Sequence, residues 1–238
     1  MEKTMIKEIE EYDIIVIGHL KWNPYFGESQ DAPPRGDPST CTSVLVRGKE
    51  QDGRKFALLI DPTLRLDKEA YYFDLNRRCG LQPEDVTHCF CTHEHFDHQA
   101  GLAYFPQAEW IAGEQTAEEL KHSPYIDGSG VRGVKGSFLP GVEAVPLPGH
   151  TDSLHGVAFW YQGRHILAAG DAVMTKNHFR ENAAMFEKDT AMAAETIRRI
   201  KRTYDVVIPG HDNLILNTCV AASENGCFGD KGQEDADP

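Results

Sequence analysis

The segment from His93 to His98 (HEHFDH) concentrates side chains that bind metal ions. The preceding residues 86–91 predict a strand, on which His93 and His95, two positions apart, would point to the same side. Asp97 would face the other way, and a turn would aim it and His98 at an adjacent ion. Imidazole and carboxylate ligands suit zinc, manganese or iron better than copper(I). A lone histidine is more often a packed or surface residue, but three histidines and two acids within six residues predict metal binding.

Three more residues of ligand type share one kind of position, directly after a glycine at the end of an apolar segment. They are His150 after VEAVPLPG, Asp171 after HILAAG and His211 after DVVIPG. Side chains at strand ends, carried on short loops, converge on one edge of a sheet, where the sites of α/β proteins form. These three residues are therefore predicted to join the 93–98 segment in one site.

The elements that would position these side chains alternate through both halves of the chain, which favours α/β or α+β layers. Apolar and β-branched runs predict strands at 13–20, 43–46, 56–60, 86–91, 110–112, 142–146, 156–161, 166–169 and 205–208. Helices are predicted at 67–79, 114–122 and 189–203; the first begins at an Asp67 N-cap and ends before Gly80. The glycine-rich residues 123–137 predict a loop.

No linker divides the chain, so residues 1–221 are predicted to form a single domain. Residues 222–238 are small, acidic and glycine-rich, which predicts a disordered tail. Residues 21–40 hold four prolines and three aromatic residues and predict a long loop. Long loops of this kind usually serve as functional lids or mobile segments.

Composition narrows the classes of partner and location. The net charge of −13, from 37 acidic and 24 basic residues, repels phosphate backbones, so no nucleic acid partner is expected. The amino terminus lacks the basic start and apolar core of a signal peptide, and no run of 18 apolar residues predicts a membrane span. A cytoplasmic location with reduced cysteines is expected. Cys89 and Cys91 only weakly suggest a zinc pair, because no second pair accompanies them.

The chain resembles the metallo-β-lactamase superfamily, specifically the dinuclear hydrolase branch that includes glyoxalase II and the acyl-homoserine lactonases. The resemblance rests on LLIDPT, GLQPEDVTHCFCTHEHFDH, PLPGHTDS, AAGDAV and VVIPGHD. It implies a four-layer αββα sandwich with metal ions at the sheet edges, and a homodimer by analogy. It also implies one metal site of His93, His95 and His150 and a second of Asp97, His98 and His211, with Asp171 bridging the two.

This ligand set implies a hydrolase with two divalent metal ions, zinc first, with manganese or iron as alternatives. Two cations that share a carboxylate can share a water and lower its pKa, and the hydroxide would attack a small ester, lactone or thioester. Asp97 and Asp171 would be the catalytic residues, since Asp97 would pass a proton to the leaving group. Asp61, at the end of FALLI, would support a ligand loop without binding metal.

The lactonase branch agrees best with the residues that follow Asp171, but the chain departs from it in the turn at residues 150–154 and at one telling position. Lactonases have a tyrosine three residues after the bridging aspartate, where this chain has Met174. Substrate contacts are predicted at Met174, His178, His155 and, within the 21–40 segment, Tyr25. The small-molecule substrate itself is not predicted.

Other functions stay open at this point. A mononuclear-iron sulfur dioxygenase would need only one ion, held by some of His93, His95, His150 and Asp171. A phosphodiesterase of the same fold and a non-catalytic metal-binding module are further alternatives. β-Lactam hydrolysis is disfavoured, because Asp171 stands where those enzymes carry cysteine or serine.

Overall fold

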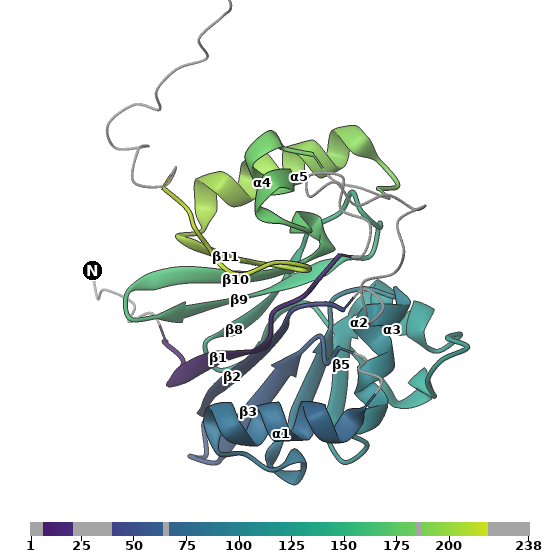
Figure 1. Ribbon diagram of the computed structural model, residues 1–238, viewed down its shortest axis with the longest axis vertical. Helices are drawn as coiled ribbons and strands as arrows, with labels where there is room; N and C mark the ends of the chain where they lie inside the picture. Colours follow the sequence, from purple (N-terminus) through teal and green to yellow (C-terminus); the bar gives the residue numbers. More distant parts are fainter. Residues whose placement is uncertain (1–6, 21–39, 64–66, 184–186, 219–238) are drawn as a thin grey trace, which may run out of the picture.

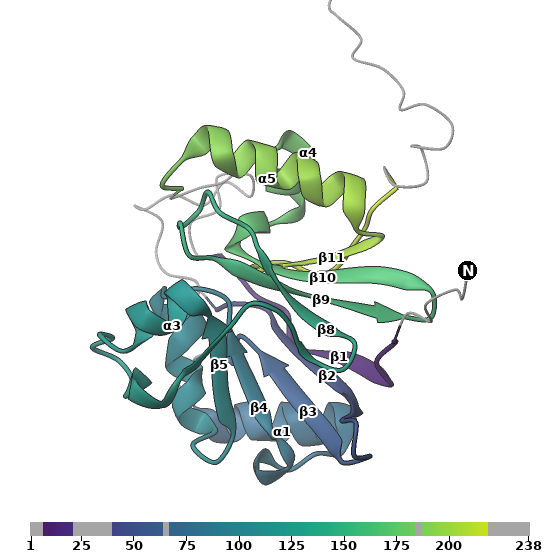
Figure 2. The ribbon, with the colours of Figure 1, turned by 180° about the vertical axis from the view of Figure 1, so that it is seen from behind.

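Two β-sheets stack face to face at the centre of the molecule, and helices cover the outer face of each sheet (Figure 1). The computed structural model describes residues 7–20, 40–63, 67–183 and 187–218. Helices α1 (Lys68–Cys79) and α3 (Glu114–Leu120) lie on one outer face, and α4 (Lys176–Glu181) and α5 (Thr190–Thr203) lie on the other. The reverse view shows the same order of layers (Figure 2). The predicted four-layer αββα sandwich is confirmed.

The first sheet contains six strands in chain order. They are β1 (Glu11–Val16), β2 (Ser43–Lys49), β3 (Lys55–Ile60), β4 (His88–Cys91), β5 (Glu109–Gly113) and β6 (Arg132–Val134). β1, β2 and β3 are antiparallel neighbours, whereas β3 to β6 run parallel to one another. Parallel neighbours require crossover connections, and the helices α1 and α3 lie within two of them. As a result β3 and β4 end at the same edge of the sheet.

The second sheet is built from the rest of the chain. Its strands, in spatial order, are β12 (Ile215–Leu216), β11 (Val206–Pro209), β10 (Arg164–Gly170), β9 (His155–Tyr161), β8 (Val142–Pro146) and β7 (Gly136–Leu139). β8 and β10 both pair antiparallel with β9, and β11 pairs parallel with β10. Strands β8, β10 and β11 therefore all end at one edge of this sheet.

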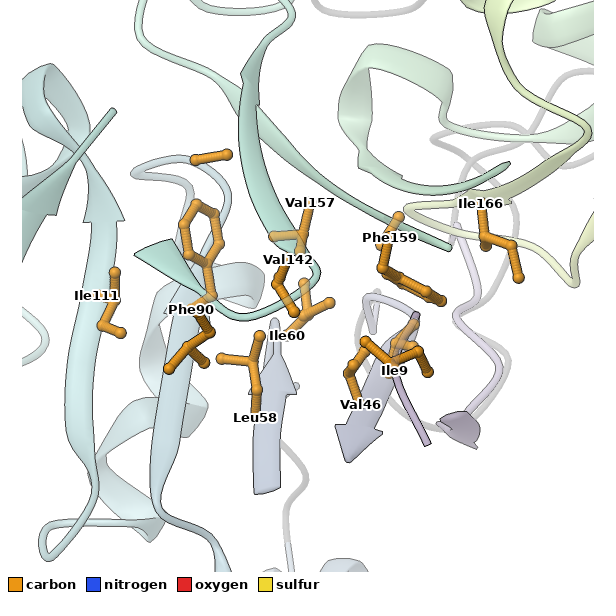
Figure 3. Close-up of a cluster of buried hydrophobic side chains, with 14 of the residues drawn as sticks. Ile9, Val46, Leu58, Ile60, Phe90, Ile111, Val142, Val157, Phe159 and Ile166 are labelled. Atoms are coloured by element: carbon orange, nitrogen blue, oxygen red, sulfur yellow. The ribbon is translucent and has the colours of Figure 1, made fainter. Parts of the chain in front are cut away.

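Alternation along β4 separates the two sides of the first sheet. Phe90 faces the apolar layer between the sheets, where it packs with Ile60, Ile111 and Val157 (Figure 3). Cys89 and Cys91 face the opposite way, into the apolar layer beneath the helices. Burial raises the pKa of both thiols, so they stay protonated and serve as apolar packing. Among the described residues, neither cysteine belongs to a group of side chains that could hold a metal ion.

Helix boundaries follow the predicted caps. The Asp67 carboxylate accepts a hydrogen bond from the Glu69 N–H at 2.9 Å, and Gly80 ends α1 in the left-handed region at φ 71°. Asp189 caps α5 in the same way by accepting from the Met192 N–H at 2.9 Å. The caps predicted for the 67–79 helix are confirmed.

One predicted segment differs from the structure. Residues 123–137 were expected to form a loop, but β6 and the beginning of β7 lie within them. These strands are edge strands, held by backbone pairing with β5 and β8, so their few apolar side chains gave no periodic signal. Within the described residues the four cysteines are free, and no helix is long and apolar enough to cross a membrane. The predicted lid at 21–40 and tail at 222–238 lie almost wholly outside the described residues.

Replacing Phe90 with alanine should strongly destabilise the protein. The Phe90 side chain is fully buried and stacks on Phe138 of β7 with ring centroids 5.3 Å apart, so it joins the two sheets. Phe90→Ala should lower the free energy of unfolding by about 3–5 kcal/mol, measured by urea denaturation of metal-free protein. Phe73→Ala is the matched control, because Phe73 is 66% exposed, and its loss should be under about 1 kcal/mol. Equal losses for the two variants would contradict this role.

Candidate metal centre

The sheet edges bring the predicted ligand residues into two adjoining groups. The ligand atoms within each group all lie within 4.8 Å of one another. The first group is His93, His95, His150 and Asp171, and the second is Asp97, His98 and His211. Five strand ends, those of β3, β4, β8, β10 and β11, meet at this point, which explains why residues distant in the sequence converge.

The 93–98 segment divides its side chains between the groups by a change of backbone conformation. His93 and His95 lie in the short loop after β4, and α2 (Phe96–Gln99) begins immediately afterwards. Asp97 and His98 are in the first turn of α2, which turns them toward the second group. The sequence analysis placed this pair by strand alternation and a turn. The structure uses a short helix instead.

Two glycines allow the strand ends to approach this closely. A Cβ added to Gly210 would lie 2.1 Å from Asp171 Oδ1, so any side chain there would displace the carboxylate. A Cβ added to Gly170 would lie 2.7 Å from Thr92 Oγ1, and the φ of +51° at Gly170 also disfavours other residues. The glycine that precedes each of these ligand positions is therefore required by the packing of the site.

The Asp171 carboxylate lies between the two groups and presents one oxygen to each. Its Oδ2 is 3.5 Å from His150 Nε2 in the first group. Its Oδ1 is 3.2 Å from both His98 Nε2 and His211 Nε2 in the second. In the first group, His150 Nε2 also lies 3.0 Å from His95 Nδ1. A carboxylate in this position could bind two ions at once, one through each oxygen.

Hydrogen bonds on the far side of the rings fix which nitrogen is available to a metal. His98 Nδ1 donates to Asp61 Oδ2 at 2.8 Å, and His211 Nδ1 donates to the Thr40 carbonyl at 3.0 Å. In the neutral form of each ring, Nε2 would then carry the free lone pair, and in both residues this atom faces Asp171. Asp61 is 2% exposed and adopts φ +46°, an unusual conformation for a residue with a side chain. Its position beneath the ligands is the one predicted from the sequence.

Electrostatics favour different protonation states for the histidines of the two groups in the metal-free site. Burial, together with the His98 ring, holds the pKa of His93 well below its ordinary value, so this ring is neutral. Burial alone would raise the pKa of Asp171, but His211 and His98 hold it well below its usual range. Burial likewise opposes a charge on His211, yet Asp171 raises the pKa of that ring. Without metal, protons on the imidazoles balance Asp171, so a metal would displace them on binding.

The residues predicted to contact substrate are less clearly placed. Met174 is 2% exposed and its carbonyl accepts from the His211 N–H at 2.8 Å, so it supports a ligand loop. His178 is 1% exposed and its Nδ1 lies 2.7 Å from Thr175 Oγ1. His155 is half-buried and its Nδ1 donates to the Ser153 carbonyl at 2.7 Å. Tyr25 lies outside the described residues. Their contact with substrate stays a prediction.

An exposed aromatic pair that was not predicted from the sequence includes a neighbour of two predicted ligand residues. Phe96, between His95 and Asp97 in the chain, is 42% exposed, and Tyr125 is 56% exposed. Their ring centroids are 4.6 Å apart in an edge-to-face arrangement. His95 and Asp97 are the only two of the seven predicted ligand residues that are not buried, so the centre is open to solvent at these two residues. Phe96 had a signal, its place inside the motif, whereas nothing marked Tyr125.

Comparison with known proteins defines the class. The model of the metallo-beta-lactamase superfamily matches residues 36–211, well over half of the chain. The chain therefore belongs to the metallo-beta-lactamase superfamily, and the predicted family is confirmed. The predicted class of enzyme, a metallo-hydrolase, is the class to which this match and the relatives below point.

Individual relatives are distant. An N-acyl homoserine lactonase from a Bacillus species is 26% identical over 162 residues, which is 62% of this chain and 64% of the lactonase. Metallo-beta-lactamase domain-containing protein 1 from Xenopus laevis is 29% identical over 143 residues, 56% of either chain. The chain thus aligns with less than two thirds of the length of these relatives.

Likeness to solved structures concerns the fold. A variant of the Bacillus thuringiensis lactonase AiiA, with N-decanoyl-L-homoserine bound at its active site, superposes with a TM-score of 0.62. The superposition covers 94% of this chain and 98% of that one at 17% identity. The two proteins share the double-sheet architecture over nearly their whole lengths.

Replacing Asp61 with asparagine should weaken metal binding. The Asp61 Oδ2 atom accepts from both Thr92 Oγ1 and His98 Nδ1, and Oδ1 accepts from the Thr92 N–H. An amide presents one acceptor and one donor, so at least one of these buried donors would lose its partner. Asp61→Asn should lower zinc affinity about 10- to 100-fold, measured by chelator competition. Asp67→Asn, at the exposed cap of α1, should bind zinc like the wild type. Unchanged affinity in Asp61→Asn would exclude the supporting role.

Proposed function

We propose that the protein is a hydrolase that uses two divalent metal ions, zinc in the first instance, on a small ester, lactone or thioester. The observation that carries the proposal is the position of Asp171, with one carboxylate oxygen facing each group of ligands. The seven side chains are the donors that zinc takes in hydrolases, imidazole nitrogen and carboxylate oxygen. His93 Nε2 is buried without a hydrogen-bond partner within the described residues, as expected of an atom reserved for a metal.

The second group of ligands favours two ions over one. A mononuclear centre would need only the first group, and a buried cluster of Asp97, His98 and His211 would then have no use. The ligand atoms of these three residues lie within 4.8 Å of one another, as the ligands of one ion do, which supports a second ion here. This observation favours hydrolysis over the single-iron alternative.

The chemistry divides between the bound ions and the protein. When bound, two divalent cations lower the pKa of water and polarise a carbonyl group. Asp171 neutralises part of their charge and holds the two groups in register. Asp97, whose side chain is 23% exposed, reaches the open side of the centre with its Oδ2 3.5 Å from His211 Nε2. From there its carboxylate can accept a proton from the nucleophile and deliver it to the leaving oxygen or sulfur.

The opening of the centre indicates the kind of group next to the scissile bond. Phe96, which lies between His95 and Asp97 in the chain, and its neighbour Tyr125 expose apolar ring surface, which suits an acyl or alkyl substituent. The lactonase relatives, named for N-acyl homoserine substrates, support a lactone or a related ester among the substrates to test. These relatives are distant, so the substrate class is proposed more broadly than their names.

Metal-loaded protein should hydrolyse members of a panel of lactones, aryl esters and thioesters. Protein refolded or dialysed with zinc or manganese should contain close to two ions per chain by elemental analysis. Asp97→Asn should retain the fold but lower kcat/KM by about 100-fold or more, because proton transfer is lost. Asp74→Asn, on the surface of α1, is the control and should keep full activity. One iron per chain with oxygen consumption, or activity untouched by Asp97→Asn, would contradict the proposal.

Phe96→Ala should selectively impair substrates with long apolar groups. The loss of aromatic surface should raise KM for a long-chain acyl substrate about 10-fold and change KM for a short one much less. Phe73→Ala removes an exposed ring from α1, far along the chain from the ligand residues, and should change neither value. A ratio of the two KM values equal to that of the wild type would mean that the aromatic pair does not contact substrate.

A further inference from the structure

Thr92 occupies the junction of four strand ends and is itself no metal ligand. It directly follows β4, its side chain is fully buried, and its backbone N–H donates to Asp61 Oδ1 after β3 at 2.8 Å. Its carbonyl accepts from the His155 N–H of β9 at 3.0 Å. Its side chain packs against Gly170 at the end of β10, where no Cβ intervenes. The two sheets therefore meet at this residue.

The Thr92 hydroxyl can make its hydrogen bonds in only one direction. Oγ1 lies 2.8 Å from Asp61 Oδ2 and 3.0 Å from His93 Nδ1. A carboxylate accepts and does not donate, so the single hydroxyl proton points to Asp61. The oxygen then has only lone pairs to offer to His93. The bond to His93 can form only if Nδ1 carries the ring proton.

A protonated Nδ1 leaves His93 Nε2 as a free lone pair. That atom is buried, has no hydrogen-bond partner among the described residues, and belongs to the group that also contains His95, His150 and Asp171. The other tautomer would place a proton where the metal should bind and two lone pairs against each other at Thr92.

We propose that Thr92 is a positioning residue that links the Asp61 carboxylate to the first metal site. Its hydroxyl hydrogen-bonds to both Asp61 and His93 and thereby fixes the tautomer of His93. Asp61 orients His98 of the second group directly, at 2.8 Å, and His93 of the first group through Thr92. One buried carboxylate thereby orients one predicted ligand residue in each group. The proposal rests on the two-metal function above and predicts that the sites share this support.

Thr87 provides a matched control at the opposite end of β4. Its hydroxyl donates to the Ala57 carbonyl at 3.1 Å and lies 2.8 Å from Nδ1 of the next residue, His88. The same threonine–histidine pair thus occurs on the same strand away from the candidate metal centre. A substitution there removes an equivalent hydrogen bond without touching the ligands.

The experiment compares Thr92→Val, Thr92→Ser and Thr87→Val with the wild type. Zinc affinity is measured by competition with a chromophoric chelator, and the tautomer of His93 in metal-free protein by long-range ¹⁵N–¹H NMR correlations. We expect Nδ1–H on His93 in the wild type. Thr92→Val should bind the more affected zinc ion about 10- to 100-fold more weakly. Thr92→Ser, which keeps the hydroxyl, and Thr87→Val should both match the wild type in affinity.

Each outcome decides for or against this role of Thr92. Wild-type affinity in Thr92→Val, or a His93 ring protonated at Nε2 in the wild type, would overturn it. Equal weakening in Thr92→Ser and Thr92→Val would also overturn it, because the methyl group and its packing on Gly170 would then be what matters. If Thr92→Val does not fold, the wild-type NMR assignment and Thr92→Ser still decide. A wild type that binds no zinc would instead refute the proposed function.

Discussion

The buried carboxylate of Asp171 is the constraint around which the site is organised. Asp171 is 3% exposed, and burying its charge costs free energy unless oppositely charged or hydrogen-bonding groups surround it. Imidazoles from both groups do so. Those rings come from strand ends in both sheets, so the carboxylate can be satisfied only when the sandwich is closed. The backbone must also come close to the carboxylate, and Gly210 permits this because it has no Cβ. The site is therefore complete only when the two sheets are packed against each other.

The orientation of the ligands depends on a layer of ordinary hydrogen bonds beneath them. Asp61, Thr92 and the Thr40 carbonyl hold the Nδ1 side of His98, His93 and His211, respectively. Each bond leaves the opposite nitrogen for a metal. Little conformational entropy is lost in forming it, because the partners lie on strand ends or next to them. The reactive surface can then be open at His95 and Asp97 while its support stays buried. The buried hydrogen bonds thus serve folding, and the two partly exposed residues serve substrate access.

The apolar layers hold the strands that carry the site in place. Phe90 and its neighbours join the sheets from inside, and the cysteines of the same strand face the helices with protonated thiols (Figure 3). The alternation of β4 thus delivers its terminal residues to the edge in a fixed register. A slip of one residue along β4 would exchange Phe90 with the cysteines and turn His93 away from His150.

The candidate ligand residues, the strand ends that carry them and the four-layer class could be predicted from the sequence, because metal-ligand spacing and glycine-terminated apolar runs are local signals. It also located the caps of α1, since Asp67 and Gly80 act within a few residues. Three features could be seen only in the folded chain: which oxygen of Asp171 faces which group, how Thr92 connects Asp61 to His93, and the contact of Tyr125 with Phe96. The edge strands within 123–137 were likewise invisible in the sequence, because backbone pairing with β5 and β8 holds them. These features depend on contacts between segments far apart in the chain, for which no local pattern is required.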